Sequence, residues 1–209
     1  MTFDKADFLE AVRLWTEWNA KINVVSRKDI DNLFEHHIMH SLAIAEYLER
    51  TGRFPGKGVT VLDVGTGGGF PGIPLAMVMP DVKFTLCDSI GKKVKVAQAV
   101  SEGLGLGNVE CVNARAEALT GAFDWVVSRA VTTLDNFYPW VKGKFRRGIL
   151  YLKGGDIEAE ISDLCRKCGV ARGDVRSWPV ADWIEDEYFE EKFVIEIGKD
   201  YLCPPKSNN

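Results

Sequence analysis

VTVLDVGTGGG, residues 59–69, joins a short apolar run to a loop that is rich in glycine. The run predicts a buried strand, and the glycines predict a tight turn into a helix from about Gly72 to Val78. In an α/β fold, ligands bind where such turns leave the carboxyl ends of the strands. The segment therefore predicts both the fold class and the place of a binding site.

Apolar runs alternate with segments of helical periodicity through most of the chain. We expect further strands over 82–87, 109–112, 125–128 and 148–153, and helices over 91–103, 134–141 and 156–167. This alternation is typical of βαβ units, so we predict an α/β fold with a doubly wound, mostly parallel, Rossmann-like sheet. Two later apolar runs, 170–175 and 193–197, are expected to pair as an antiparallel edge.

Two segments with apolar residues at helical spacing precede this region. The first covers residues 4–20 and contains Trp15 and Trp18, which we interpret as core residues rather than as platforms for stacked bases. The second covers residues 30–48, with Asp29 as its expected N-cap. We predict an N-terminal helical extension (1–51), an α/β domain (52–203) and a disordered tail (204–209).

Composition and charge exclude several classes of protein. The net charge of −4 is not the basic footprint that is usual for a nucleic-acid binder, so we interpret the local basic clusters as solvated faces. No apolar run approaches the ~18–20 residues that cross a bilayer, and the acidic N-terminus lacks the core of a signal peptide. We therefore expect a cytoplasmic protein with no membrane partner.

The cysteines and histidines do not form a metal-binding pattern. The chain has five cysteines, an odd number that suits a reducing compartment better than a disulfide framework. Cys165-x-x-Cys168 has no second pair, and the histidines lie far away at 36, 37 and 40. We interpret these two cysteines as structural residues of a helix, take His36 and His37 as surface or packing residues, and predict no metal.

The spacing of the glycine loop favours one ligand class over another. A dinucleotide site needs G-x-G-x-x-G, but the sixth position counted from Gly65 is Phe70. Asp63 stands two residues before Gly65, and a carboxylate there repels a pyrophosphate and suits a cationic ligand such as S-adenosylmethionine. Asp88, at the end of the second strand, is placed to accept hydrogen bonds from ribose hydroxyls, a role it could also fill in a nicotinamide dehydrogenase.

The sequence resembles the bacterial small-subunit (16S) ribosomal RNA guanine-N7 methyltransferases, also called the glucose-inhibited division protein B family. The similarity extends in order over nearly the whole chain, and its most specific parts are GTGGGFPGIPLA and the SRA and LKG motifs. The matching segments are WTEWNAKINVVS (15–26), HHIMHSL (36–42), LDVGTGGGFPGIPLA (62–76), LCDSIGKKV (86–94), SRA (128–130) and YLKGG (151–155). One position departs from the family pattern, because His40 stands where the family usually has aspartate.

The resemblance implies a class I methyltransferase that uses S-adenosylmethionine and acts on a guanine of 16S ribosomal RNA or of the small ribosomal subunit. It implies that Arg129 belongs to the cofactor site and faces the substrate, with Lys153 near the same pocket. The resemblance and the glycine loop together imply seven further residues of the cofactor site. These are Asp63, Gly65, Gly67, Phe70, Asp88, Ala116 and Glu117.

The chemistry of the reaction limits what these residues have to do. Guanine N7 carries a free lone pair, so no general base is needed, and we expect Arg129 and Lys153 to position the substrate. The target base has to lie in a loop or be extruded from its stack. We expect a monomer. Three alternatives stay open: a methyltransferase of proteins or small molecules, a nicotinamide-dependent oxidoreductase, and a non-catalytic ribosome assembly factor.

Overall fold

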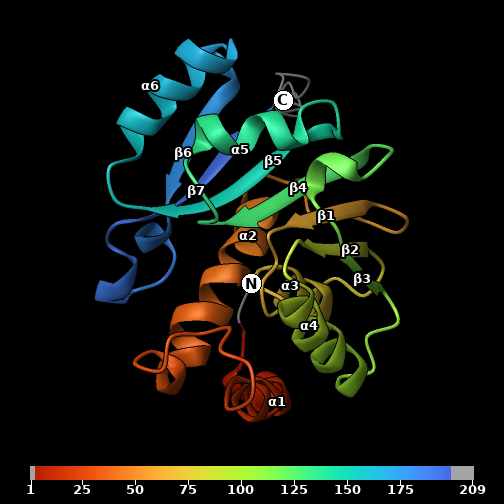
Figure 1. Ribbon diagram of the computed structural model, residues 1–209. Coiled ribbons are helices and arrows are strands. Elements are labelled where there is room, and N and C mark those ends of the chain that lie inside the picture. The colour runs from red at the N-terminus through yellow and green to blue at the C-terminus, as the bar shows by residue number, and fades with distance from the viewer. Residues whose placement is uncertain (1–2, 199–209) are drawn as a thin grey trace, which may run out of the picture.

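The computed structural model describes residues 3–198, which contain one sheet of seven strands in the order β3-β2-β1-β4-β5-β7-β6 (Figure 1). β1 to β5 run parallel, whereas β7 is antiparallel to both of its neighbours. This confirms the doubly wound, mostly parallel sheet with an antiparallel pair at its edge. The strands are β1 Thr60–Val64, β2 Lys83–Asp88, β3 Val109–Asn113, β4 Phe123–Arg129, β5 Phe145–Gly154, β6 Val175–Pro179 and β7 Lys192–Ile197.

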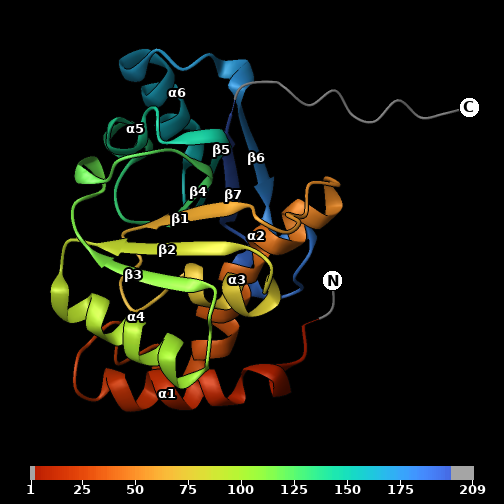
Figure 2. The same ribbon diagram turned by 90° about the vertical axis from the view of Figure 1, so that its right-hand side faces the viewer.

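Helices cover both faces of the sheet. α2, α3 and α4 lie on one face and α5 and α6 on the other, while α1 packs against α4 (Figure 2). The helices are α1 Leu9–Asn19, α2 Met39–Arg50, α3 Gly72–Val78, α4 Gly91–Gly103, α5 Leu134–Val141 and α6 Ile157–Cys168. In the described part of the chain, no helix combines the length and the apolar character that a membrane crossing needs.

Two hydrophobic cores follow from the alternation of side chains along the strands. In β1, Val61 points into the core beneath α2 to α4, and Leu62 points into the core beneath α5 and α6. The first core also takes in Trp15 and Phe8 from the N-terminal segment. The N-terminal helices are therefore packed into the same apolar core as the sheet, and Trp15 is a core residue as predicted.

The prediction of one regular helix over residues 30–48 is wrong for its first part. Residues Ile30–Asn32 form a 3₁₀ turn and Leu33–Ile38 a π-helical segment, and the regular helix α2 begins only at Met39. Asp29 stands at the N-cap position of the 3₁₀ turn, but its side chain makes no capping hydrogen bond, because both of its carboxylate oxygens contact histidine rings of the π-helical segment, His36 and His37. These contacts, with side chains seven and eight positions further along the chain, prevail over the capping preference of aspartate.

The strand predicted at 170–175 lies further along the chain. Arg172–Asp174 form a 3₁₀ turn, and β6 spans Val175–Pro179, paired with β7 from Val175 opposite Ile197 to Pro179 opposite Phe193. An edge strand tolerates its terminal proline because the missing N–H need not face a neighbour. Cys165 and Cys168 lie in α6 as predicted, and the predicted tail 204–209 lies outside the described residues.

Candidate cofactor and substrate site

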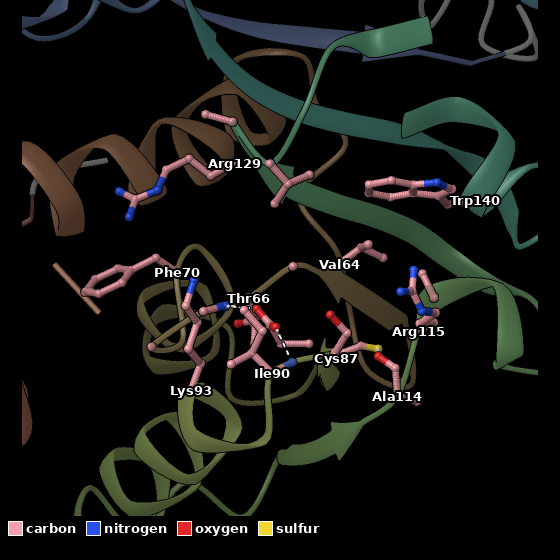
Figure 3. A pocket seen from close by; sticks show the side chains of 18 of the residues that line it. Val64, Thr66, Phe70, Cys87, Ile90, Lys93, Ala114, Arg115, Arg129 and Trp140 are labelled. Atoms are coloured by element: carbon pink, nitrogen blue, oxygen red, sulfur yellow. Dashed lines mark hydrogen bonds between the residues drawn. The ribbon is translucent and has the colours of Figure 1, made fainter. Parts of the chain in front are cut away.

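A cavity of about 470 Å³ opens at the carboxyl ends of β1, β2 and β4 (Figure 3). This is the edge that the glycine loop predicts. Phe70 and Arg129 lie at one end of the cavity, and Arg115 and Trp140 at the other. Of the residues predicted for the site, the cavity is lined by Gly65, Gly67, Phe70, Asp88, Ala116, Glu117 and Arg129, and not by Asp63 or Lys153.

Backbone geometry explains two of the glycines in the loop. Gly65 and Gly67 have φ of +70° and +57°, in the left-handed region that disfavours residues with a Cβ. A Cβ on Gly65 would lie 2.3 Å from Val131 Cγ1, whereas one on Gly67 would meet no atom within 4 Å. Gly65 therefore allows the loop to pack against the segment after β4, and Gly67 leaves its side of the cavity open.

Asp88 links the glycine loop to the end of β2. Its Oδ2 accepts a hydrogen bond of 2.9 Å from the amide of Gly67, and its Oδ1 accepts one of 2.8 Å from the amide of Ile90. Each carboxylate oxygen can accept a second hydrogen bond. Asp88 can therefore shape the loop and still receive hydroxyl groups of a ligand in the cavity.

Asp63 lies behind the glycine loop and is not part of the cavity wall. It is completely buried, and its Oδ2 accepts hydrogen bonds from Thr66 Oγ1 (2.6 Å) and from the amide of Gly72 (2.8 Å). Burial raises the pKa of Asp63 to about 7. The expectation that this carboxylate faces a cationic ligand directly does not match its position, and its contacts join the loop to the start of α3.

The N-terminal helix reaches the same loop. The indole Nε1 of Trp15 donates a hydrogen bond of 2.7 Å to the carbonyl oxygen of Gly68, and the ring stacks on Phe70 with centroids 4.3 Å apart. The sequence did not indicate this contribution, because helical spacing predicts that Trp15 is buried but not which residue it contacts.

Arg129 ends β4 and lies half-buried, with its guanidinium 4.9 Å from the centre of the Phe70 ring. Its NH2 group lies 3.0 Å from Nδ1 of His37, whose Nε2 in turn lies 2.6 Å from Oδ2 of Asp29. Burial lowers the pKa of Arg129 to about 10, which leaves the group charged at neutral pH. Asp29 and His37 do not line the cavity but contact its edge through Arg129, a connection that the sequence did not indicate.

Lys153 lies behind the wall of the cavity. Its Nζ donates to the carbonyl of Thr132 (3.1 Å) and forms an ion pair of 2.9 Å with Glu160. The hydroxyl of Tyr151 binds the backbone of the same threonine. Lys153 thus supports the turn after Arg129, in which Ala130 has a φ of +46°.

Comparisons with known proteins identify relatives over most of the chain. Residues 4–184 match the family model described as rRNA small subunit methyltransferase G. Proteins named Ribosomal RNA small subunit methyltransferase G are similar to the chain: the one from Christiangramia forsetii is 46% identical over 93% of this chain and 90% of its own length. The one from Porphyromonas gingivalis is 48% identical over 88% and 82%.

Solved methyltransferases share the fold at low sequence identity. Magnesium protoporphyrin IX methyltransferase from Synechocystis, solved with bound SAM, gives a TM-score of 0.64 at 17% identity over 94% of this chain and 98% of that one. A SAM-dependent methyltransferase from Aquifex aeolicus gives 0.57 at 19% identity, with 94% and 98% covered. With the family model matched over most of its length, the chain belongs to the GidB family, the rRNA small subunit methyltransferases G.

Proposed function

We propose that this protein transfers the methyl group of S-adenosylmethionine to N7 of a guanine in 16S ribosomal RNA. The observation that carries the choice of cofactor is the hydrogen bond from the Gly67 amide to Asp88. A pyrophosphate would need free loop amides, and here a carboxylate occupies one of them. A ligand with ribose hydroxyls and without phosphate suits this loop better than a dinucleotide.

The lining residues divide between the parts of such a cofactor. Asp88 would accept the ribose hydroxyls, and Ala116 and Glu117 would flank the adenine at the end of the cavity where Trp140 lies. The opposite end, with Phe70 and Arg129, remains for the amino-acid part of the cofactor and for the target base. S-adenosylmethionine supplies an electrophilic methyl group when bound.

The reaction needs positioning more than proton transfer. Guanine N7 attacks with its own lone pair, so the protein has to hold the base in line with the methyl group. A cation cannot stabilise the positive charge that moves onto the purine, but it can bind an oxygen of the substrate. We assign this role to Arg129, and we assign to Lys153 an indirect role through the Thr132 turn.

The RNA substrate also bears on where and how the enzyme works. Because ribosomal subunits assemble in the cytoplasm, we expect a cytoplasmic enzyme. We expect it to act as a monomer, which sedimentation of the purified protein can check.

Methylation of unmethylated small ribosomal subunits tests the proposal. The purified protein is incubated with methyl-labelled S-adenosylmethionine and the subunits, and the RNA is digested to nucleosides. We expect label in 7-methylguanosine, loss of label in Asp88→Ala, and normal labelling in Glu110→Gln, which changes an exposed carboxylate of the neighbouring strand. Label in a protein or small-molecule fraction instead, or cofactor binding without turnover, would contradict the proposed substrate.

A further inference from the structure

Arg129 has an unusual partner for a cation at the edge of a charged cavity. Among residues 3–198, no carboxylate lies within ion-pair distance of its guanidinium, and its side-chain hydrogen bond goes to the imidazole of His37 at 3.0 Å. Asp88 and Glu117 line the same cavity without pairing with it. The charge of Arg129 is thus held in place without being neutralised.

The donor and acceptor roles in this contact follow from arginine chemistry. A guanidinium only donates, so Nδ1 of His37 has to accept, and the ring proton then resides on Nε2. Nε2 lies 2.6 Å from Oδ2 of Asp29, which accepts that proton's hydrogen bond. Burial and the charge of Arg129 lower the pKa of His37 to about 4, in keeping with a neutral ring.

Both ends of this chain of contacts are anchored. The second oxygen of Asp29 lies 2.6 Å from Nδ1 of His36, whose ring stacks on Tyr188 with centroids 3.7 Å apart and planes 5° from parallel. At the other end, the guanidinium carbon lies 4.9 Å from the centre of the Phe70 ring, which is itself stacked on Trp15. The guanidinium is held by the hydrogen bond to His37 and by its contact with the Phe70 ring, so its remaining N–H groups are oriented.

We propose that Asp29 and His37 are positioning residues, which orient Arg129 so that its free N–H groups can bind an anionic or carbonyl oxygen in the cavity. The inference rests on the proposed function for the identity of that oxygen, which comes either from the carboxylate of the cofactor or from the RNA substrate. A neutral imidazole suits this role because it accepts a hydrogen bond without cancelling the charge, as a carboxylate at the same place would do.

Two substitutions at His37 separate the two hydrogen bonds of the ring. Asn places its amide oxygen near the position of Nδ1 and keeps an acceptor for Arg129, whereas Gln places its amide nitrogen near Nε2 and keeps the link to Asp29. Calorimetry of S-adenosylhomocysteine binding tests whether the oxygen that Arg129 binds belongs to the cofactor. The KM for small subunits, measured apart from kcat, tests whether it belongs to the RNA. His36→Gln is the matched control, because it removes the ring nitrogen Nδ1 that makes the other contact of Asp29.

We expect His37→Gln, which loses the acceptor for Arg129, to weaken one of these two interactions about tenfold. Asp29→Ala and His37→Asn keep that acceptor and lose only the link to Asp29, so we expect a loss of about threefold, with His36→Gln close to wild type. Equal effects of His37→Asn and His37→Gln in both measurements would overturn the proposal. If no RNA is methylated but S-adenosylhomocysteine binding still separates the two variants, the positioning pair stands and the proposed substrate fails.

The protonation state of His37 gives a second readout that does not depend on activity. The titratable and charged groups facing this ring are Asp29, His36 and Arg129, with His40 also coupled to it electrostatically. Nitrogen-15 spectra of histidine-labelled protein should show a neutral ring with the proton on Nε2 at neutral pH, and a higher pKa in Arg129→Met. A proton on Nδ1 of the neutral ring, or a charged ring at neutral pH, would overturn the proposal.

Discussion

Nε1 of Trp15 donates a hydrogen bond of 2.7 Å to the carbonyl oxygen of Gly68, across 53 positions of sequence. The donor belongs to α1 and the acceptor to the loop between β1 and α3. Because Phe70 stacks on the same indole, the N-terminal helix holds two residues of the loop at once. The conformation of the candidate cofactor site therefore depends on a helix outside the alternating β–α part of the chain.

Trp15→Phe should uncouple this support while retaining most of the packing. The Gly68 carbonyl would lose its buried donor, which costs about 1–3 kcal/mol of unfolding free energy. We expect a matching loss of stability in urea unfolding and weaker binding of S-adenosylhomocysteine. Trp18→Phe is the control, because Trp18 is only partly buried and does not contact the loop through its indole nitrogen in the described structure. Equal losses in both variants would contradict the role given to Trp15.

Gly65→Ala and Gly67→Ala should affect the protein in different ways. Both place a Cβ on a residue with positive φ, at a cost of about 1 kcal/mol each. At Gly65 the new atom also collides with Val131, so thermal unfolding should show a clearly larger loss of stability for this variant. At Gly67 it enters the open cavity, so calorimetry should show weaker cofactor binding with a small change in stability. The reverse ranking in stability would show that the loop packs differently.

The raised pKa of Asp63 predicts a stability that depends on pH, and substitution by the neutral isostere asparagine should remove this dependence. Its folded-state pKa of about 7 lies above the ordinary value of 3.8, so its contribution to stability is present at low pH and is lost as the pH rises toward 7. The unfolding free energy of Asp63→Asn relative to that of the wild type should therefore rise between pH 5 and pH 8, by on the order of 2 kcal/mol. Urea unfolding of both proteins at the two pH values measures this difference. A constant difference would mean that Asp63 is ionised throughout.

The lowered pKa of His37 predicts the opposite effect, a loss of stability as the solution becomes more acidic. Burial depresses its pKa from 6.5 to about 4, so its contribution is complete above pH 6.5 and is lost as the pH falls toward 4. Between pH 6.5 and pH 5 the wild type should lose about 2 kcal/mol through this residue. Burial lowers the pKa of His40 as well, which adds to the loss. His37→Gln should show a shallower decline in the same urea titration, and an unchanged slope would count against a buried neutral ring.

Much of the fold could be predicted from local patterns in the sequence. The helices expected over 91–103 and 134–141 coincide with α4 and α5, and each expected parallel strand lies within two or three residues of its observed bounds. Apolar alternation and helical spacing record which side of an element is buried, and this is a property of neighbouring residues. The glycine loop and Asp88 follow from the same local order, because both come directly after a strand.

Contacts between distant segments were decided only by the tertiary structure. Arg129 and His37 are 92 positions apart, and no spacing relates them, yet they meet where the π-helical segment packs at the end of β4. Even over seven and eight positions, the contacts of Asp29 with His36 and His37 depend on how the π-helical segment folds back, and they replace the helix cap that the sequence context predicts. Periodicity shows that a side chain is buried, whereas its partner depends on how the helices lie on the sheet. The alternation of strands and helices determined the fold class, and residues 59–69 determined the edge of the sheet that carries the cavity, because both are local patterns. The packing of the N-terminal helices on the sheet decided which side chains complete the site.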